Sequence, residues 1–360
     1  MITNKQNDSR ELGTISEFSE SLGSPIIIAG PCSAETEEQT LTAAKGVAAA
    51  GCAVFRAGLW KPRTHPGGFE GVGEAGLLWL QHVKTETGLL TATEVATAAH
   101  VTAALDSGID FLWLGARTTA NPFTVQEVAD AIASNKRKDV AVLVKNPISP
   151  DVELWLGALQ RIHGAGVRRL AAVHRGFTSA ASTGYRNDPQ WQIPMELKRR
   201  CPTLPILVDP SHMGGNRDLV STLSQQALDM GFDGLMIEVH PTPDKALSDA
   251  AQQISPIELQ QLLSVLTVRT GTGNDQALAM LRQLIDQCDN DVLSALSRRM
   301  DIVRQIGQLK RESGMPIVQT QRFNQLLEHR IAQADKLRLS PEFIANLLQL
   351  IHQEAVAQQL

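Results

Sequence analysis

The sequence is poor in cysteine, and its cysteines follow no framework spacing. Only four occur in 360 residues, and no CxxC pair connects any two of them. A disulfide scaffold is therefore excluded, and a reducing, cytoplasmic location fits this usage best. Cys52 and Cys288 are expected to be small core residues, because unpaired cysteines are commonly buried.

A strong net charge and a long hydrophobic run are also missing. The formal net charge is −5 at pH 7, which gives no reason to expect nucleic acid, so any anion site must be local. No apolar stretch is long enough to span a membrane, and we expect no membrane association. The first residues are polar and contain no apolar core of a signal peptide.

Up to residue 268, short apolar runs alternate with helical patterns. Eight runs are apolar on both sides, as expected of parallel strands covered by helices. They are Pro25–Ala29, Ala53–Arg56, Leu89–Thr93, Phe111–Leu114, Val140–Lys145, Arg169–Val173, Ile206–Asp209 and Leu235–Val239. Eight such repeats predict an α/β fold, the (β/α)8 TIM barrel, with its active site at the carboxyl ends of the strands. A doubly wound sheet is the alternative, although it usually has fewer strands.

The pattern changes after residue 268, where a short glycine-containing linker is followed by sequence without strand signals. Three helices are predicted there, at 275–312, at about 320–335 and at about 341–358, the last with Ser340 as N-cap and Pro341 at its first position. We therefore divide the chain into an N-terminal extension (1–23), a barrel (24–268), a linker (269–274) and a small all-α domain (275–360).

Four residues with metal-binding side chains follow different predicted strands: Cys32, His212, Glu238 and Asp249. Taken singly, each is more often an ordinary polar residue at a strand end. The strands of a barrel end on one face, however, so we expect the four to converge. A set that combines a thiolate, an imidazole and carboxylates suits Mn²⁺, Fe²⁺, Co²⁺ or Zn²⁺ rather than Mg²⁺.

The same strand ends carry six cationic residues: Arg56, Lys61, Arg63, Arg117, Lys145 and Arg175. Six like charges in one cleft would repel one another and be costly to desolvate unless anions fill it. Guanidinium groups recognise phosphate and carboxylate. The cluster therefore predicts a site for two phosphorylated substrates.

Six motifs at these strand ends resemble one enzyme family. They are Gly30-Pro31-Cys32-Ser33, Lys61-Pro62-Arg63-Thr64, Gly115-Ala116-Arg117-Thr118, Val144-Lys145-Asn146-Pro147, Val208-Asp209-Pro210-Ser211-His212 and Ile237-Glu238-Val239-His240-Pro241. Over residues 24–265 the chain resembles 3-deoxy-D-arabino-heptulosonate 7-phosphate (DAHP) synthase of the shorter barrel subfamily. The resemblance implies a shikimate-pathway condensation of phosphoenolpyruvate with erythrose 4-phosphate.

The resemblance also implies roles for individual residues. Cys32, His212, Glu238 and Asp249 would hold one divalent metal ion per barrel. Arg117, Lys145 and Arg175 would hold the phosphate of phosphoenolpyruvate, and Arg56 and Lys61 would face its carboxylate. Arg63 and Thr64 would bind erythrose 4-phosphate. Lys61 would also assist proton transfer, while Glu94 and His174 would orient or deprotonate water.

Two alternatives remain for the barrel. The related octulosonate 8-phosphate synthases use arabinose 5-phosphate, but they normally carry an asparagine-containing motif where this chain has Pro62-Arg63-Thr64. A phosphosugar sensor without catalysis is the second alternative, which the full set of candidate ligands disfavours. Turnover of arabinose 5-phosphate without turnover of erythrose 4-phosphate would reverse the assignment.

The long predicted helix carries charges on or beside its apolar stripe. The stripe is Leu278, Leu281, Ile285, Val292, Leu296, Val303 and Ile306. Arg282, Asp289, Arg299 and Lys310 fall on or next to it. Charges on a buried stripe are rare unless they are paired or functional, although snorkelling from its edge is an alternative. Three cations along one seam indicate a pocket for a small dianion.

This tail resembles the all-helical chorismate mutase family. The similar pieces are Leu281-Arg282-Gln283, Leu296-Ser297-Arg298-Arg299, Ile306-Gly307-Gln308-Leu309-Lys310, Met315-Pro316-Ile317, Arg322 and Val356-Ala357-Gln358-Gln359. The resemblance implies that Arg299 binds a carboxylate of chorismate, Lys310 and Gln359 contact its ether oxygen, and Arg322 lies beside the site. It implies that Arg282 reaches the site of another subunit, so we expect a homodimer or a higher oligomer.

The tail departs from that family at three positions. Phe323 and Gln319 stand where acidic residues are usual, and Ala355 stands where serine is common. These changes affect recognition of the substrate hydroxyl. Two hypotheses follow: a working mutase that converts chorismate to prephenate, or an allosteric module that binds chorismate or prephenate and regulates the barrel.

Overall fold

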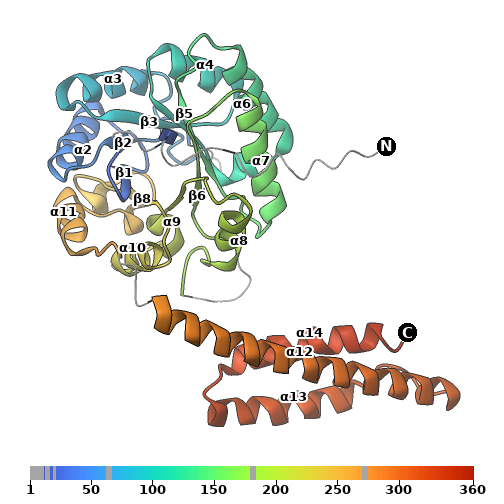
Figure 1. Cartoon of the computed structure of the whole chain (residues 1–360). Coiled ribbons are helices and arrows are strands. Elements are labelled where there is room, and N and C mark those ends of the chain that lie inside the picture. Colours follow the sequence, from blue (N-terminus) through green and yellow to red (C-terminus); the bar gives the residue numbers. More distant parts are fainter. Residues whose placement is uncertain (1–11, 13–16, 19–21, 62–66, 179–183, 270–274) are drawn as a thin grey trace. The chain divides into compact units, whose positions relative to one another are not determined.

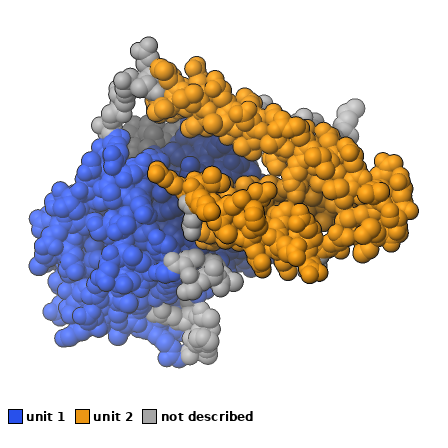
Figure 2. Space-filling model, turned by 90° about the horizontal axis from the view of Figure 1, so that it is seen from below, with its two compact units in different colours: residues 1–269 blue, residues 270–360 orange. Residues whose placement is uncertain are grey.

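The computed structural model describes residues 12, 17–18, 22–61, 67–178, 184–269 and 275–360. The chain forms two compact units, Met1–Arg269 and Thr270–Leu360, which Figure 2 shows in different colours. Within the described residues, no helix is long and apolar enough to cross a membrane.

The first unit is a closed barrel of eight parallel strands in sequence order (Figure 1). The strands are β1 (Ile26–Gly30), β2 (Val54–Arg56), β3 (Leu90–Val95), β4 (Phe111–Leu114), β5 (Ala141–Lys145), β6 (Leu170–His174), β7 (Ile206–Val208) and β8 (Gly234–Glu238). Pairing of β1 with β8, from Ile26 opposite Gly234 to Gly30 opposite Glu238, closes the ring. The predicted barrel is confirmed, and the doubly wound sheet is excluded.

Helices surround the strands (Figure 1). They are α2 (Glu37–Ala49), α3 (Ala75–Thr87), α4 (Ala98–Asp106), α5 (Ala116–Thr119), α6 (Pro122–Ser134), α7 (Val152–Gly164), α8 (Gln192–Arg200), α9 (Pro210–Gly214), α10 (Val220–Asp229) and α11 (Pro256–Val265). Short 3-10 helices are η1 (Arg217–Leu219), η2 (Pro243–Lys245) and η3 (Ala250–Gln252). Side chains cap several helices; Asp151 accepts from Leu154 N, and Ser255 forms a capping box with Glu258.

Strand alternation separates two hydrophobic cores. One lies between the strands and the helices, and the other fills the barrel lumen with side chains such as Ile28, Trp113 and Leu143. Every second residue of a strand faces the lumen. At the carboxyl ends of four strands, the residue in this alternation is charged. Those residues are Arg56, Glu94, Lys145 and Glu238. The strand period thus places charge at one end of an apolar lumen.

Residues before β1 close the opposite end of the lumen. The Phe18 side chain is fully buried, and its ring meets the ring of Phe111 edge-on with centroids 5.8 Å apart. Leu22 belongs to the same cluster, and Leu12 packs in the outer core. The segment predicted as an extension, 1–23, therefore contributes side chains to both cores of the barrel.

The second unit consists of α12 (Asp275–Glu312), α13 (Thr320–Ala334), η4 (Asp335–Leu337) and α14 (Pro341–Ala357). Ser340 caps α14 by accepting from Phe343 N, and Pro341 opens the helix, as predicted. The stripe of α12 is largely exposed in the single chain; Leu281 and Ile285 are each 58% exposed. The prediction that Cys288 is a core residue is wrong, because it is exposed on this helix, whereas Cys52 is buried as expected.

Candidate active site

A cavity of about 310 Å³ opens at the carboxyl ends of the barrel strands. Seven of the residues predicted for the barrel site line it: Lys61, Glu94, Arg117, Lys145, Arg175, His212 and Asp249. Arg186 and Asn187 line it as well. The barrel therefore gathers cations and acids from distant segments of the chain around one space.

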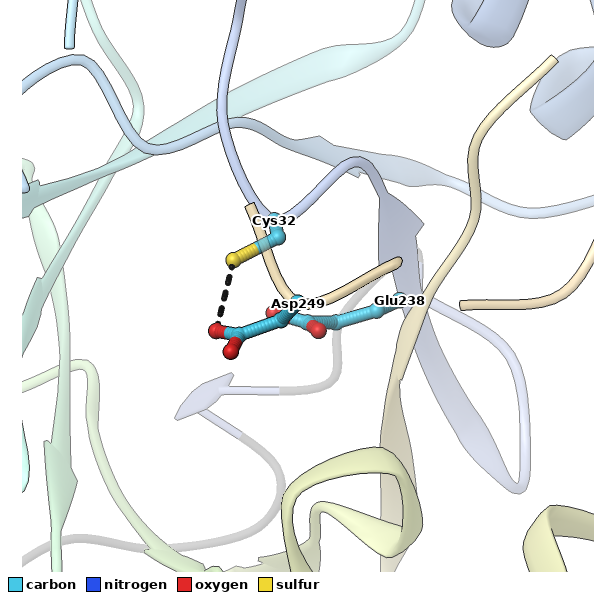
Figure 3. A group of neighbouring side chains, drawn as sticks. All are labelled: Cys32, Glu238 and Asp249. Atoms are coloured by element: carbon cyan, nitrogen blue, oxygen red, sulfur yellow. Dashed lines mark hydrogen bonds between the residues drawn. The ribbon is translucent and has the colours of Figure 1, made fainter. Parts of the chain in front are cut away.

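Three of the four predicted metal ligands form a tight group. Ligand atoms of Cys32, Glu238 and Asp249 lie within 4.8 Å of one another, as Figure 3 illustrates. The Cys32 Sγ atom is 3.3 Å from Asp249 Oδ2. His212 stands beside this group, with its Nε2 atom 3.8 Å from Glu238 Oε1. The geometry brings together a thiol, two carboxylates and a neighbouring imidazole, the donor types that suit a divalent transition metal.

The closing strand pair explains how these residues meet. Cys32 lies two residues beyond β1, and Glu238 ends β8, where it is paired with Gly30. Asp249 enters from the following loop with φ of 48°, in the left-handed region that asparagine and aspartate tolerate better than most residues. Residues more than two hundred positions apart thus share one end of one strand pair.

The thiol environment is consistent with a cation site. Burial, and then the negative charge of Glu238, raises the pKa of Cys32 to about 12. Without a cation the thiol therefore stays protonated and donates to Asp249. A bound divalent ion favours the deprotonated form of such a ligand and would neutralise the neighbouring carboxylates, so the residues present fit the metal.

Two buried cations, Arg56 and Lys145, stand at the carboxyl ends of β2 and β5. The Arg56 side chain is buried over the Trp113 ring, 4.8 Å from its centroid, and donates through Nη2 to Glu238 Oε1 at 3.1 Å. Among the described residues its Nε and Nη1 atoms have no hydrogen-bond partner. Lys145 donates to Asp209 Oδ2 at 2.7 Å, and burial lowers the pKa of Lys145. The two unused donors of Arg56 could bind an anion.

Further cations line the cavity wall. Arg175 donates from Nη1 to Asn187 Oδ1 at 2.7 Å, and burial lowers the pKa of Arg175 to about 10. The positive charges of Arg186 and Arg117 act on Arg175 in the same direction. Mutual repulsion between these groups would be relieved by a polyanion in the cavity, since oppositely charged groups favour the charged forms.

The two predicted proton-transfer residues of β3 and β6 occupy different places. Glu94 lines the cavity, close to Gly115, where a β-carbon would lie 2.2 Å from Glu94 Oε1. His174 instead lies behind the cavity lining, buried among the rings of Trp155, Phe177 and Trp191. It contacts Pro189 O through Nε2 at 2.7 Å, and burial lowers the pKa of His174 to about 3. The imidazole is therefore neutral at ordinary pH.

The predicted site and the described site differ at several residues. Arg63 and Thr64, predicted to bind erythrose 4-phosphate, lie outside the described residues. Conversely, sequence reasoning named Asp209 only as part of a motif and overlooked Arg186. Asp209 contacts both Lys145 and His212, the latter with Nδ1 2.8 Å from its Oδ2. Strand alternation could have signalled Asp209, which lies two residues after the lumen residue Leu207; no periodic pattern covers Arg186.

The helical unit brings together part of its predicted site. Lys310 on α12 donates to Gln359 Oε1 at 3.2 Å and to Ile317 O. Gln359 is buried, 8% exposed, and lies across Gly307, where a β-carbon would be 3.0 Å from Gln359 Cα. Arg299 is half-buried, and its Nη1 has no hydrogen-bond partner among the described residues.

His352 lies close enough to Arg299 and Lys310 for their charges to affect its pKa. Burial lowers the pKa of His352, and the positive charges of Arg299 and Lys310 lower it further. The Phe323 ring stacks on His352 with centroids 4.0 Å apart. Thus Phe323, which stands where the resemblance leads us to expect an acid, packs against imidazole instead.

The remaining two predicted arginines of the helical unit are exposed. Arg322 is on α13. Arg282 is 17 residues from Arg299 along α12, which a helical rise of about 1.5 Å per residue converts to about 26 Å. Within one chain, Arg282 is too far along the helix to share the Arg299 site.

Comparison with known proteins gives two family matches. The sequence profile described as DAHP synthetase I family matches residues 14–274, and the profile described as chorismate mutase type II matches residues 281–360. The chain is 35% identical to the phospho-2-dehydro-3-deoxyheptonate aldolase of Thermotoga maritima over 228 residues. That alignment covers 63% of this chain and 64% of the relative, which is less than two thirds of its length.

Other similar proteins extend the picture. The 2-dehydro-3-deoxyphosphooctonate aldolase of Geobacter sulfurreducens is 30% identical over 264 residues, covering 67% of this chain and 90% of the relative. A crystal structure of the Thermotoga maritima DAHP synthase superposes with a TM-score of 0.60 at 32% identity, covering 67% of each chain. One family match covers most of the chain, and a second family match covers its C-terminal part. This chain therefore belongs to the DAHP synthetase I family and carries a C-terminal chorismate mutase type II domain.

Proposed function

We propose that the barrel condenses phosphoenolpyruvate with erythrose 4-phosphate to give DAHP and inorganic phosphate. The observation that carries this proposal is the joining of a Cys32, Glu238 and Asp249 cluster to a cation-lined cavity at one end of the barrel. The cluster suits a divalent ion and the cavity suits phosphorylated anions. A metal-dependent condensation of two phosphorylated substrates would need both the metal cluster and the cation-lined cavity.

The cations position the first substrate. Arg117, Lys145 and Arg175 would bind the phosphate of phosphoenolpyruvate. The Lys61 ammonium and the two Arg56 donors that have no partner within the described part of the chain would bind its carboxylate. Fixing both anionic ends orients C3 toward the aldehyde and screens the repulsion between two anionic substrates. Arg63 and Thr64 would bind the phosphate-bearing aldose.

The reaction then needs two proton movements. A divalent ion held by Cys32, His212, Glu238 and Asp249 would polarise the aldehyde of erythrose 4-phosphate. As C3 attacks that carbon, Lys61 would protonate the developing alkoxide. Glu94, in the same cavity, would take the proton from the water that adds at C2. The resulting hemiketal phosphate loses inorganic phosphate by cleavage of the C2–O bond, while the C2 hydroxyl transfers its proton to the departing phosphate and becomes the ketone.

The direct test is a phosphate-release assay with phosphoenolpyruvate and each aldose, with and without EDTA. We expect release with erythrose 4-phosphate, loss with EDTA and recovery when a divalent metal is returned. Release with arabinose 5-phosphate alone would instead establish the octulosonate activity, which several relatives carry in their names. Binding of both substrates without release would establish a sensor.

For the tail, we propose that it rearranges chorismate to prephenate. Two features support this proposal: the Nη1 atom of Arg299 has no partner within the described residues, and the Lys310 and Gln359 side chains contact each other. Arg299 would bind a carboxylate, and Lys310 and Gln359 would stabilise the ether oxygen as its negative charge grows. The rearrangement is pericyclic, so no covalent intermediate is required.

A regulatory role is the alternative for the tail, and Phe323 favours it. Its ring stacks on His352, at a position where substrate-hydroxyl recognition would need a polar group. Assays on the whole chain separate the two: prephenate formation lost in Arg299→Ala supports the mutase. Prephenate binding without turnover, together with inhibition of the barrel, supports the allosteric module.

The proposal includes a homodimer or higher oligomer formed through the helical unit. The exposed stripe of α12 supports it, since Leu281 and Val292 are 58% and 56% exposed in the single chain. Sedimentation at micromolar concentration should give at least a dimer. We also propose a cytoplasmic location, because the free cysteines of the chain suit a reducing compartment.

A further inference from the structure

A short segment after β8 carries one candidate metal ligand and contacts two others. Asp249 precedes η3, and Gln252 ends it. Gln252 and the next residue, Gln253, are both completely buried. Buried amides are almost always hydrogen-bonded, so their partners indicate what each side chain does.

The Gln252 side chain fixes the carboxylate of Glu238. Its Nε2 donates to Glu238 Oε2 at 2.7 Å, while Arg56 Nη2 donates to the other oxygen at 3.1 Å. Two donors on opposite oxygens restrict rotation of the carboxylate plane. The Glu238 backbone is also fixed, because its N–H donates to Ser211 Oγ at 3.0 Å.

Arg186 determines which way the Gln252 amide points. Its Nη1 donates to Gln252 Oε1 at 2.6 Å and to Asp249 Oδ1 at 2.9 Å. Since guanidinium can only donate, the amide oxygen must face Arg186 and the amide nitrogen must face Glu238. Gln252 thus connects two candidate ligands, Asp249 through the shared guanidinium and Glu238 directly.

The neighbouring glutamine acts on the third ligand. Cys32 N donates to Gln253 Oε1 at 3.0 Å, and Gln253 Nε2 donates to Ser248 O at 2.8 Å. Gln253 therefore holds the backbone of Cys32 against the loop that carries Asp249. It does not contact the Glu238 carboxylate among the contacts described, so the roles of the two amides can be tested separately.

We propose that Gln252 is a positioning residue of the metal centre, which holds the Glu238 carboxylate in the orientation that binds a divalent ion. This inference rests on the metal site of the proposed function. Groups that orient metal ligands through hydrogen bonds typically change metal affinity about 10–100-fold when they are removed. Gln252 has the required geometry and is not itself one of the residues that line the cavity, although its partner Arg186 is.

The experiment titrates metal-free full-length protein with Co²⁺ and follows thiolate-to-cobalt charge-transfer absorption, which reports coordination by Cys32. Two variants are compared with the wild type. Gln252→Met removes both amide contacts, whereas Gln252→Glu keeps the acceptor for Arg186 and removes the donor to Glu238. Gln225→Met is the matched control, because Gln225 on α10 also makes several hydrogen bonds, but with Asp229 and Thr267.

We expect the dissociation constant for Co²⁺ to rise about 10–100-fold in both Gln252 variants and to stay unchanged in Gln225→Met. Thermal unfolding of the metal-free proteins is recorded alongside, so that a general loss of stability is recognised. Wild-type affinity in Gln252→Glu, or in folded Gln252→Met, would overturn the positioning role. Absence of Co²⁺ binding by the wild type would instead refute the metal site itself.

Discussion

At the residue scale, Cys32 links protonation to cation binding. Its pKa is raised to about 12 by burial and then by the charge of Glu238, so a thiolate there requires a compensating positive charge. The thiolate would therefore form together with the bound ion, with release of a proton. On the proposed function, this fully buried side chain would serve as a metal ligand.

Replacing this thiol should separate the two proposed activities. Cys32→Ala is expected to abolish metal-dependent phosphate release while leaving the conversion of chorismate to prephenate unchanged, because the helical unit does not use the ion. Both rates are measured on the same preparation. Cys52→Ala, at another buried cysteine, should retain both activities. Condensation that persists in metal-stripped Cys32→Ala protein would refute the ligand assignment.

His174 should make barrel stability depend on pH. Burial lowers its pKa from an ordinary 6.5 to about 3, so between these values the unfolded chain binds a proton that the folded chain does not. Stability is therefore fully present above pH 6.5 and falls as the pH decreases, by up to about 1.4 kcal/mol per pH unit.

The measurement compares urea unfolding of the wild type and His174→Gln at pH 7 and pH 5. Glutamine retains a donor for Pro189 O but does not titrate. The wild type should lose about 2 kcal/mol more than the variant over this range. Equal losses in the two proteins would show that this imidazole titrates normally in the folded state.

At the scale of elements, Phe18 acts as a plug at one end of the barrel lumen. Phe18 is fully buried against Phe111 at the amino end of the lumen. Phe18→Ala should lower the free energy of unfolding by about 3–5 kcal/mol, because a large buried ring is replaced by a cavity. Phe123→Ala is the control; Phe123 is 88% exposed on α6, and its loss should change stability by about 0.5 kcal/mol or less. Urea unfolding followed by circular dichroism measures both, and a Phe18 variant as stable as the control would contradict the plug.

How far the sequence predicts these elements depends on periodicity. The eight strands and three tail helices come from apolar patterns that the structure confirms within a few residues. Asp209 could have been placed by the alternation of β7, but Arg186 lies in a loop where no period applies. Phe18 was assigned to an extension because short apolar contacts before the first strand leave no pattern. The burial predicted for Cys288 rests on the general tendency of unpaired cysteines to be buried, and that tendency does not show whether its face of α12 is covered within one chain.

At the scale of the whole molecule, the helical unit has too few buried side chains to account for its apolar content. Val303, Ala334 and Ala355 are buried. Leu281, Ile285 and Val292, all on α12, are more than half exposed. A second copy of the unit would cover such a face. It would also supply the Arg282 side chain that one chain places too far from Arg299.

Mixing two inactive variants should therefore restore mutase activity. If each site combines Arg299 of one chain with Arg282 of its partner, both Arg282→Ala and Arg299→Ala homodimers lack every complete site. A heterodimer of the two variants has one site with both arginines and one with neither. Equal mixing with free exchange makes half of the dimers heterodimers, so activity should recover to about one quarter of the wild-type value. Prephenate formation is measured on the mixture and on heterodimers isolated by different affinity tags after co-expression, for which about one half of the wild-type value is expected, because one of their two sites is complete. A purified heterodimer that remains inactive would show that Arg282 does not complete the partner's site.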